Sequence, residues 1–414
     1  MVSPELHWTS PCGESNIEAA LTLIEQEQSK ATRAFIAKRL ALSRTTASTI
    51  ISQLMQLDLV KELDSSINGR GRPAIPLRLT ESVWYALGAS YHNETWNFLI
   101  SDLYGKPIAT HQIPTGSIDP SHFISALLEG IDHMLDRVPG RLLPLIGIGT
   151  PGLVNSTTGV ISRADDLGWK KVAVGEPLTK HTGLPCIVMN RHRAAGLAEA
   201  RYGSGRGVKN LIYIGIETGI SAAFINDGVL LEGADYSAGE IGHMLIDPNG
   251  PLCGCGRYGC LQAFSSSQAL VRLVEERYRS LRSLGEKVEP NALWDAMSEG
   301  RLTGVFIVHE AHKGNEIALS CMKKIAVQLG IASSNLINIL NPEKIIIGGV
   351  LSNTGPLLTE LIRSEASSRA MESPFSRVNI EQSILGSCSG ELGAASLALK
   401  SKIPLAQRWL DSRK

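Results

Sequence analysis

The sequence contains few aromatic residues and no long apolar segment. Phe, Trp and Tyr make up 5% of its 414 residues. A membrane-spanning helix needs about 20 consecutive apolar residues, and no stretch approaches that length. The first residues also lack the basic and then apolar layout of a secretory signal. These absences predict a cytoplasmic protein with no membrane partner.

The sequence also has no net charge, and its number of cysteines is odd. The 40 Lys and Arg residues equal the 40 Asp and Glu residues, which argues against indiscriminate binding to nucleic acids. However, residues 29–78 hold nine Lys or Arg against three Asp or Glu, a surplus that suits local contact with DNA phosphates. Three of the seven cysteines lie within 253–260, which favours metal binding in a reducing compartment over a disulfide framework.

The chain is long and contains many glycines. It is too long for one ordinary hydrophobic core, so two or three domains are expected. Its 40 glycines suit an α/β fold, in which tight turns join strands to helices. From Trp84 onward, apolar patterning predicts strands at 96–101, 145–149, 186–189, 210–216 and 344–347, and helices at 120–137, 191–202, 266–284 and 316–340. No internal repeat is visible.

The first eighty residues predict three helices. Apolar residues at helical spacing indicate two short helices around 17–24 and 34–40. Ser43 is a good N-cap for a third helix. An arginine and short hydroxyl side chains at a helix N-terminus suit contacts with phosphates and base edges in the major groove. The residues of this helix expected to contact DNA are Arg44, Thr45, Thr46, Ser48 and Thr49.

A predicted hairpin follows these helices. Segments 59–63 and 75–79 are prone to form strands, and they flank a loop that contains the sequence Gly-Arg-Gly-Arg-Pro. Arg70 and Arg72 in this loop suit the narrow minor groove of A·T-rich DNA. Residues 1–80 are therefore predicted to form a winged helix-turn-helix domain that binds a double-stranded DNA operator. The alternative is a three-helix cap with a solvated basic loop.

The rest of the chain carries a series of recognisable motifs. They are GIGTPGLV (147–154), LGW (167–169), LPCIVMN (184–190), AEARYGSG (198–205), GEIGH (239–243), CGCGRYGCLQAFSS (253–266), IIIGGV (345–350) and LGAA (392–395). This set resembles the ROK family, named for repressors, open reading frames and kinases, and in particular its winged-helix repressors that respond to xylose, N-acetylglucosamine or glucose. The resemblance implies an α/β, actin-like (ribonuclease H-like) sugar-kinase body with two lobes. The first lobe would be 81–200, completed by 395–414, and the second 201–394.

The cysteine-rich motif supplies a set of metal ligands. One imidazole and three thiolates are the donors of a closed, tetrahedral structural zinc site, and glycines at 254, 256 and 259 let the chain wrap around an ion. The predicted zinc ligands are His243, Cys253, Cys255 and Cys260. In the alternative, the cysteines pack as small apolar side chains and His243 is an ordinary core histidine.

Three positions that the resemblance assigns to catalysis carry unsuitable residues. The first phosphate loop, D-x-G-G-T in the family, is Ser-Tyr-His-Asn-Glu at 90–94, so Ser90 replaces the metal-linked aspartate. Glu217 opens the second phosphate loop, where a carboxylate repels ATP. Arg191 replaces the aspartate that acts as base, and a guanidinium cannot accept a proton. Arg191 is expected either to form a salt bridge, at the surface or closing the lobes, or to clamp an anionic effector.

The sugar-binding positions of the family are partly retained. Gln262 stands in place of a glutamate, which alters ligand preference by roughly 1 to 3 kcal/mol, so a neutral hexose cannot be assumed. The predicted effector residues are Asn190, Arg191, Glu240, His243 and Gln262.

The hypothesis that follows is a transcription regulator without enzyme activity. We expect a repressor of carbohydrate metabolism genes that binds DNA as a homodimer or homotetramer and is controlled by a sugar or sugar-derived effector between the lobes. The alternatives are an active ROK-type sugar kinase and a body without ligand that only dimerises the DNA-binding domain.

Overall fold

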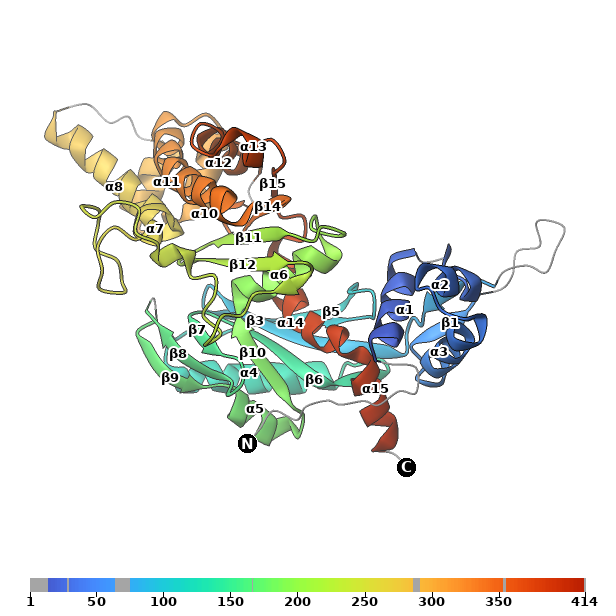
Figure 1. Ribbon diagram of the computed structural model, residues 1–414. Helices are drawn as coiled ribbons and strands as arrows, with labels where there is room; N and C mark the ends of the chain where they lie inside the picture. Colours follow the sequence, from blue (N-terminus) through green and yellow to red (C-terminus); the bar gives the residue numbers. More distant parts are fainter. Residues whose placement is uncertain are drawn as a thin grey trace.

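The computed structural model describes residues 14–27, 30–63, 75–165, 167–285, 291–352 and 355–412. Its N-terminal unit consists of helices α1 (Glu14–Glu27), α2 (Arg33–Arg39) and α3 (Arg44–Gln56) and strands β1 (Val60–Glu62) and β2 (Leu77–Leu79) (Figure 1). β1 and β2 pair antiparallel, and an isolated bridge joins Thr32 to Pro76. All three predicted helices and both predicted strands of this region are present.

A five-stranded sheet forms one half of the body, in the order β10-β6-β3-β4-β5. Its strands are β3 (Trp84–His92), β4 (Thr95–Ser101), β5 (Pro107–Pro114), β6 (Arg141–Thr150) and β10 (Cys186–Asn190). β3, β6 and β10 run parallel to one another. β4 is antiparallel to both of its neighbours, β3 and β5. Helices α4 (Pro120–Leu135) and α5 (Gly175–Thr182) and a small sheet of β7 (Leu153–Asn155), β8 (Val160–Ala164) and β9 (Trp169–Ala173) belong to this half.

The second half contains a sheet with the same path, in the order β13-β12-β11-β14-β15. Its strands are β11 (Leu211–Ile216), β12 (Ile220–Asn226), β13 (Val229–Leu230), β14 (Lys344–Gly348) and β15 (Asn379–Gln382). Each sheet begins with three antiparallel strands and then adds two parallel strands beside the first. The fold is therefore an internal repeat of topology, which the sequence does not reveal because the same path is followed by different residues.

The remaining helices cover the second sheet or join the two halves. Those of the second half are α7 (Leu261–Ser265), α8 (Ser267–Ser283), α9 (Ala292–Ser298), α10 (Gly304–His312), α11 (Glu316–Leu340), α12 (Leu357–Ser367) and α13 (Glu372–Phe375). α6 (Arg191–Tyr202) packs on β11 and β12, α14 (Ser389–Lys400) packs on β3 and β6, and the two helices pack on each other between the sheets (Figure 1). α14 thus crosses the lobe boundary predicted between 394 and 395. No described helix is long and apolar enough to cross a membrane.

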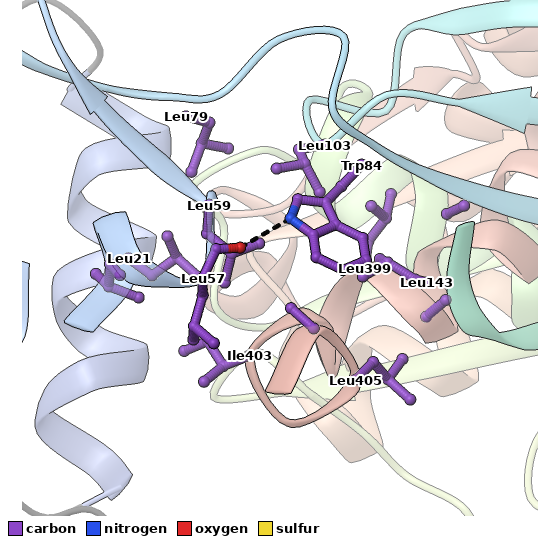
Figure 2. Packing of buried hydrophobic residues seen from close by; sticks show 14 of the residues in the cluster. Leu21, Leu57, Leu59, Leu79, Trp84, Leu103, Leu143, Leu399, Ile403 and Leu405 are labelled. Atoms are coloured by element: carbon purple, nitrogen blue, oxygen red, sulfur yellow. Dashed lines mark hydrogen bonds between the residues drawn. The ribbon is translucent and has the colours of Figure 1, made fainter. Parts of the chain in front are cut away.

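The N-terminal unit is packed directly on the body. The indole of Trp84, on β3, donates a hydrogen bond of 2.9 Å to the carbonyl of Leu57, and leucines of the unit and of the body surround the ring (Figure 2). Arg141 also forms an ion pair of 2.6 Å with Asp58. The C-terminal helix α15 (Lys402–Asp411) contributes Ile403 and Leu405 to the same buried cluster. The orientation of the N-terminal unit is therefore set by a shared core.

Candidate functional site

Helix α3 has the local structure expected from its sequence. The Ser43 hydroxyl accepts a hydrogen bond of 3.0 Å from the backbone N–H of Thr46 and caps the helix. Two of the five predicted contact residues, Thr46 and Ser48, are half-buried, and the Thr46 hydroxyl is bonded to that of Ser43. The other three are exposed: Arg44, Thr45 and Thr49. These three are the accessible part of the predicted DNA-contacting surface.

The two wing arginines, Arg70 and Arg72, lie outside the described residues. The strands that flank their loop are held against the helices by Arg33, which bonds to the Glu62 carboxylate at 3.0 Å and to the Ser48 carbonyl at 3.1 Å. Arg33 was counted in the basic surplus of the sequence. Its contacts show that it joins α2, α3 and β1.

The predicted metal ligands converge. The ligand atoms of His243, Cys253, Cys255 and Cys260 all lie within 4.8 Å of one another. The Cys255 and Cys260 sulfurs are 3.7 Å apart, and the Cys253 sulfur is 3.8 Å from His243 Nδ1. Tetrahedral zinc with bonds of about 2.3 Å to sulfur separates its ligand atoms by about 3.8 Å. This cluster has the donors and the size to hold a metal ion.

The five predicted effector residues line one cavity of about 70 Å³ between the halves of the body. Asn190 ends β10, and its side chain accepts from His192 N at 2.9 Å and donates to Gly152 O at 3.1 Å. Glu240 precedes a short helical turn that ends at His243, and Gln262 lies on α7. The chain therefore gathers donors and acceptors from both halves around one small space.

Arg191 bridges the two loops that hold phosphates in the kinases. Its Nη2 lies 2.9 Å from the Glu217 carboxylate, and its Nη1 donates to the Tyr91 carbonyl at 3.1 Å. The two charged side chains are 9% and 10% exposed. Tyr91 is on β3 of the first half and Glu217 follows β11 of the second. The structure therefore contains the salt bridge between lobes that was one of the two roles expected for Arg191.

Electrostatics keep this ion pair charged and its surroundings neutral. Burial alone would raise the pKa of Glu217, but the adjacent Arg191 guanidinium lowers it, so the carboxylate is ionised. Burial lowers the pKa of His192 to about 4, so its imidazole is neutral at pH 7. The space between the loops is occupied by an internal ion pair.

The first phosphate loop is a tight hairpin turn without glycine. Asn93 and Glu94 link the paired residues His92 and Thr95, and both have positive φ angles, 50° and 54°. Such angles are typical of the two-residue turn that joins adjacent strands. Ser90, at the predicted metal-aspartate position, is 1% exposed. The carboxylate of this turn, Glu94, is exposed and lies four positions after Ser90.

Arg193 is a buried residue that the sequence reasoning did not single out. It is 1% exposed, and its Nη1 donates to the Tyr236 carbonyl at 2.6 Å. Its Nε and Nη2 have no partner among the described residues. The signal in the sequence was the run Arg-His-Arg at 191–193, directly after the Asn190 cap of a helix that the structure buries.

Known proteins that resemble this chain include kinases and repressors. The ROK family model matches residues 93–401. The chain is 31% identical to a glucokinase of Halalkalibacterium halodurans over 76% of this chain and 94% of that protein. It is 26% identical to the DNA-binding transcriptional repressor Mlc of Escherichia coli over 92% of each protein. The crystal structure of a ROK family transcriptional regulator, a homologue of the E. coli MLC protein, has a TM-score of 0.79 and 28% identity, covering 95% of this chain and 97% of that one.

The share of this chain that each relative covers agrees with its division into an N-terminal unit and a body. The glucokinase covers about three quarters of this chain, whereas the repressor and the regulator structure cover almost all of it. Both the matched structure and the two sheets confirm the predicted two-lobed, actin-like α/β body. On the family match and the identity to its members, this chain belongs to the ROK family.

Proposed function

We propose that this protein is a sequence-specific DNA-binding transcription regulator, a cytoplasmic repressor of carbohydrate metabolism genes that responds to a sugar or a sugar derivative. The observation that carries the proposal is the match to a repressor and to a regulator structure over 92% and 95% of this chain, which is more than the body contains, so both matches extend into the N-terminal unit. The exposed polar start of α3 and the shared core that holds it on the body support the same conclusion.

In this proposal α3 enters the major groove and the wing loop contacts the minor groove. A homodimer or homotetramer presents two such units to half-sites about one helical turn apart. The test measures the affinity of the protein for DNA fragments that it selects from genomic DNA. We expect Arg44→Ala with Thr45→Ala, and separately Arg70→Ala with Arg72→Ala, to weaken binding by about 10- to 100-fold. Lys324→Ala, on an exposed position of α11, is the matched control, and unchanged affinity in both pairs would overturn the proposal.

The effector occupies the cavity lined by Asn190, Glu240, His243 and Gln262. That cavity is smaller than the roughly 300 to 1,000 Å³ of typical ligand pockets, so a sugar enters only when the lobes separate or Arg191 moves. A neutral sugar leaves the Arg191–Glu217 pair in place, whereas an anionic derivative competes with Glu217 for the guanidinium. Thermal-shift measurements with sugars, amino sugars and sugar phosphates distinguish these classes, because a ligand of the folded state raises the Tm.

The cysteine cluster holds a structural zinc ion in this proposal. Its four donors leave no open coordination position. The Nδ1 of His243 is the atom next to Cys253, so the other ring nitrogen can bond to the effector, and the metal fixes that imidazole. Cys255→Ser should reduce zinc content and lower the Tm, while Cys388→Ser, outside the cluster, should change neither. A full complement of zinc in Cys255→Ser would contradict the assignment.

The competing proposal is a sugar kinase, since glucokinases are related at similar identity. Arg191 cannot act as the base, and Glu217 places a negative charge at the second phosphate loop. We therefore expect no sugar-dependent release of ADP above background. Appreciable turnover that is abolished by a substitution of Asn190 would establish the kinase instead.

A further inference from the structure

A second, larger cavity lies where the N-terminal unit meets the body. It measures about 810 Å³, within the range of ligand pockets, and it is separate from the cavity between the lobes. Its walls come from α1, the β4–β5 turn, the end of α6, the β12–β13 hairpin and the junction of α14 with α15. Figure 1 shows α15 beside α1 at this place. A molecule here touches the N-terminal unit and the body at the same time.

A buried group of charges forms part of the wall. The Glu25 carboxylate accepts hydrogen bonds from Arg201 at 3.1 and 2.9 Å and from Lys402 Nζ at 2.7 Å. One carboxylate therefore neutralises only one of two cations. The lining as a whole has six Lys or Arg against four Asp or Glu, although the sequence has no net charge.

Lys402 is the least compensated member of this group. Its residue is 3% exposed, and an ammonium group has three N–H donors. Within the described part of the chain, Glu25 is its one hydrogen-bond acceptor. Burial and the adjacent Arg201 lower the pKa of Lys402 to about 8 against the opposing effect of Glu25. A buried positive charge of this kind is costly unless an anion is close to it.

We propose that this cavity binds a small anionic metabolite, whose phosphate or carboxylate group pairs with Lys402 and Arg201. The size of the cavity leaves room for the organic part of such a molecule beside the charged wall. The ligand is distinct from the sugar in the cleft. Binding of the anion to this cavity does not depend on the proposed DNA function. Only an effect of the bound anion on operator affinity would depend on it.

The test is thermal unfolding of the full chain with increasing inorganic phosphate or succinate, against potassium chloride at equal ionic strength. A bound anion raises the Tm, and above its Kd the rise continues with the logarithm of the anion concentration, whereas chloride at the same ionic strength has no such effect. A larger response to phosphate identifies a phosphoryl ligand, and a larger response to succinate identifies a carboxylate. If neither anion raises the Tm more than chloride does, the proposal is overturned.

Two sets of variants locate the site. Lys402→Met leaves Glu25 and Arg201 as a neutral pair, so the variant should fold and should lose the anion response. Lys400→Met with Arg206→Ala changes exposed residues of the rim and should weaken the response several-fold. Lys324→Met is remote from this cavity and should respond like the wild type. If Lys402→Met does not fold, the rim variant still decides, because a full response in it contradicts the assignment.

The other arginine-containing site requires its own control. Arg191→Met with Glu217→Gln removes one of the two guanidinium groups that line the cleft, and adding Arg163→Met removes the other; the anion response should persist in both variants. If the anion response disappears in these cleft variants and persists in Lys402→Met, the anion binds in the cleft, and the proposed site between the N-terminal unit and the body is refuted. These measurements need no operator, so their failure leaves the proposed regulator untouched, and failure of DNA binding leaves the anion site untouched.

Discussion

Arg191 and Glu217 stabilise the protein only as a pair. Each side chain is about nine-tenths buried, and a buried charge without a counterion costs several kcal/mol. Each residue also removes a requirement of kinase chemistry, the base in one case and a phosphate loop free of negative charge in the other. Together they give two neutralised charges and a link between the halves of the body. In the proposed regulator, the two residues that are unsuited to kinase chemistry thus also form a contact between the halves of the body.

Glu217→Gln should lower the free energy of unfolding by about 3 to 5 kcal/mol, because Arg191 remains buried and charged. Combining it with Arg191→Met should recover most of that loss, since no buried charge remains. Urea denaturation of the wild type, both single variants and the double variant measures the coupling. Additive losses in the double variant would show that the two side chains act independently.

Glu391 on α14 should make stability depend on pH. Burial raises the pKa of this carboxyl from 4.5 to about 7, and Oε2 has no hydrogen-bond partner in the described part of the chain. The folded state therefore retains a proton that the unfolded chain releases, and this group lowers stability as pH rises from 4.5 through 7. Glu391→Gln should stabilise the protein at pH 8 by on the order of 3 kcal/mol and have little effect at pH 4. A pH-independent difference in urea denaturation would contradict this.

At the scale of elements, α6 joins the candidate effector pocket to the N-terminal unit. It begins at Arg191 in that pocket, and Arg201 in its last turn binds Glu25 of α1. Its 12 residues span about 18 Å. Packing against α14 over this length makes it a stiff connection. In the proposed regulator, we therefore expect movement of its first turn on ligand binding to reach α1.

Breaking the contact at the far end of α6 should uncouple the two sites. The double variant Glu25→Gln with Lys402→Met removes the carboxylate and one of its two cations, so that Arg201 is the one cation left at this contact. The affinity for sugar and the affinity for the operator should each change only a few-fold. The effect of sugar on operator affinity, typically 5- to 150-fold in allosteric proteins, should fall toward none. Titrations of operator with and without sugar measure it, and Glu18→Gln, at an exposed position of α1, is the control. Undiminished coupling would show that the signal takes another route.

Single elements were predictable where local chemistry determines them. The capping hydroxyl of Ser43 and the capping amide of Asn190 mark the starts of α3 and α6, and both helices begin where the sequence predicts. The clustering of the metal ligands was also predictable, because three of the four lie within eight positions. The pairing of Arg191 with Glu217 was not, since β10 and β11 belong to different sheets and only the packing of the two halves brings their ends together. The contact of Glu25 with α6 likewise depends on how the N-terminal unit docks.

At the scale of the molecule, the N-terminal unit and the first half of the body are parts of one hydrophobic cluster. Trp84 is fully buried in it, and its ring meets that of Trp409 edge to face at 5.4 Å between centroids. Residues of α1, α3, β2, β3, α14 and α15 all contribute. An N-terminal unit joined in this way cannot rotate freely on its linker. In the proposed regulator, a change in the body therefore reaches DNA by moving this unit as a whole.

This shared core predicts that the N-terminal unit and the first half of the body unfold in one calorimetric transition. Trp84→Ala should lower the free energy of unfolding by about 3 to 5 kcal/mol and allow the N-terminal unit to melt first, because the cavity and the lost bond to Leu57 lie between the two parts. Trp294→Ala, on α9 of the second half, should lower stability without releasing that unit. Limited proteolysis during heating identifies the segment that opens first. An early transition of the N-terminal unit in the wild type would show that the shared core does not hold it to the body.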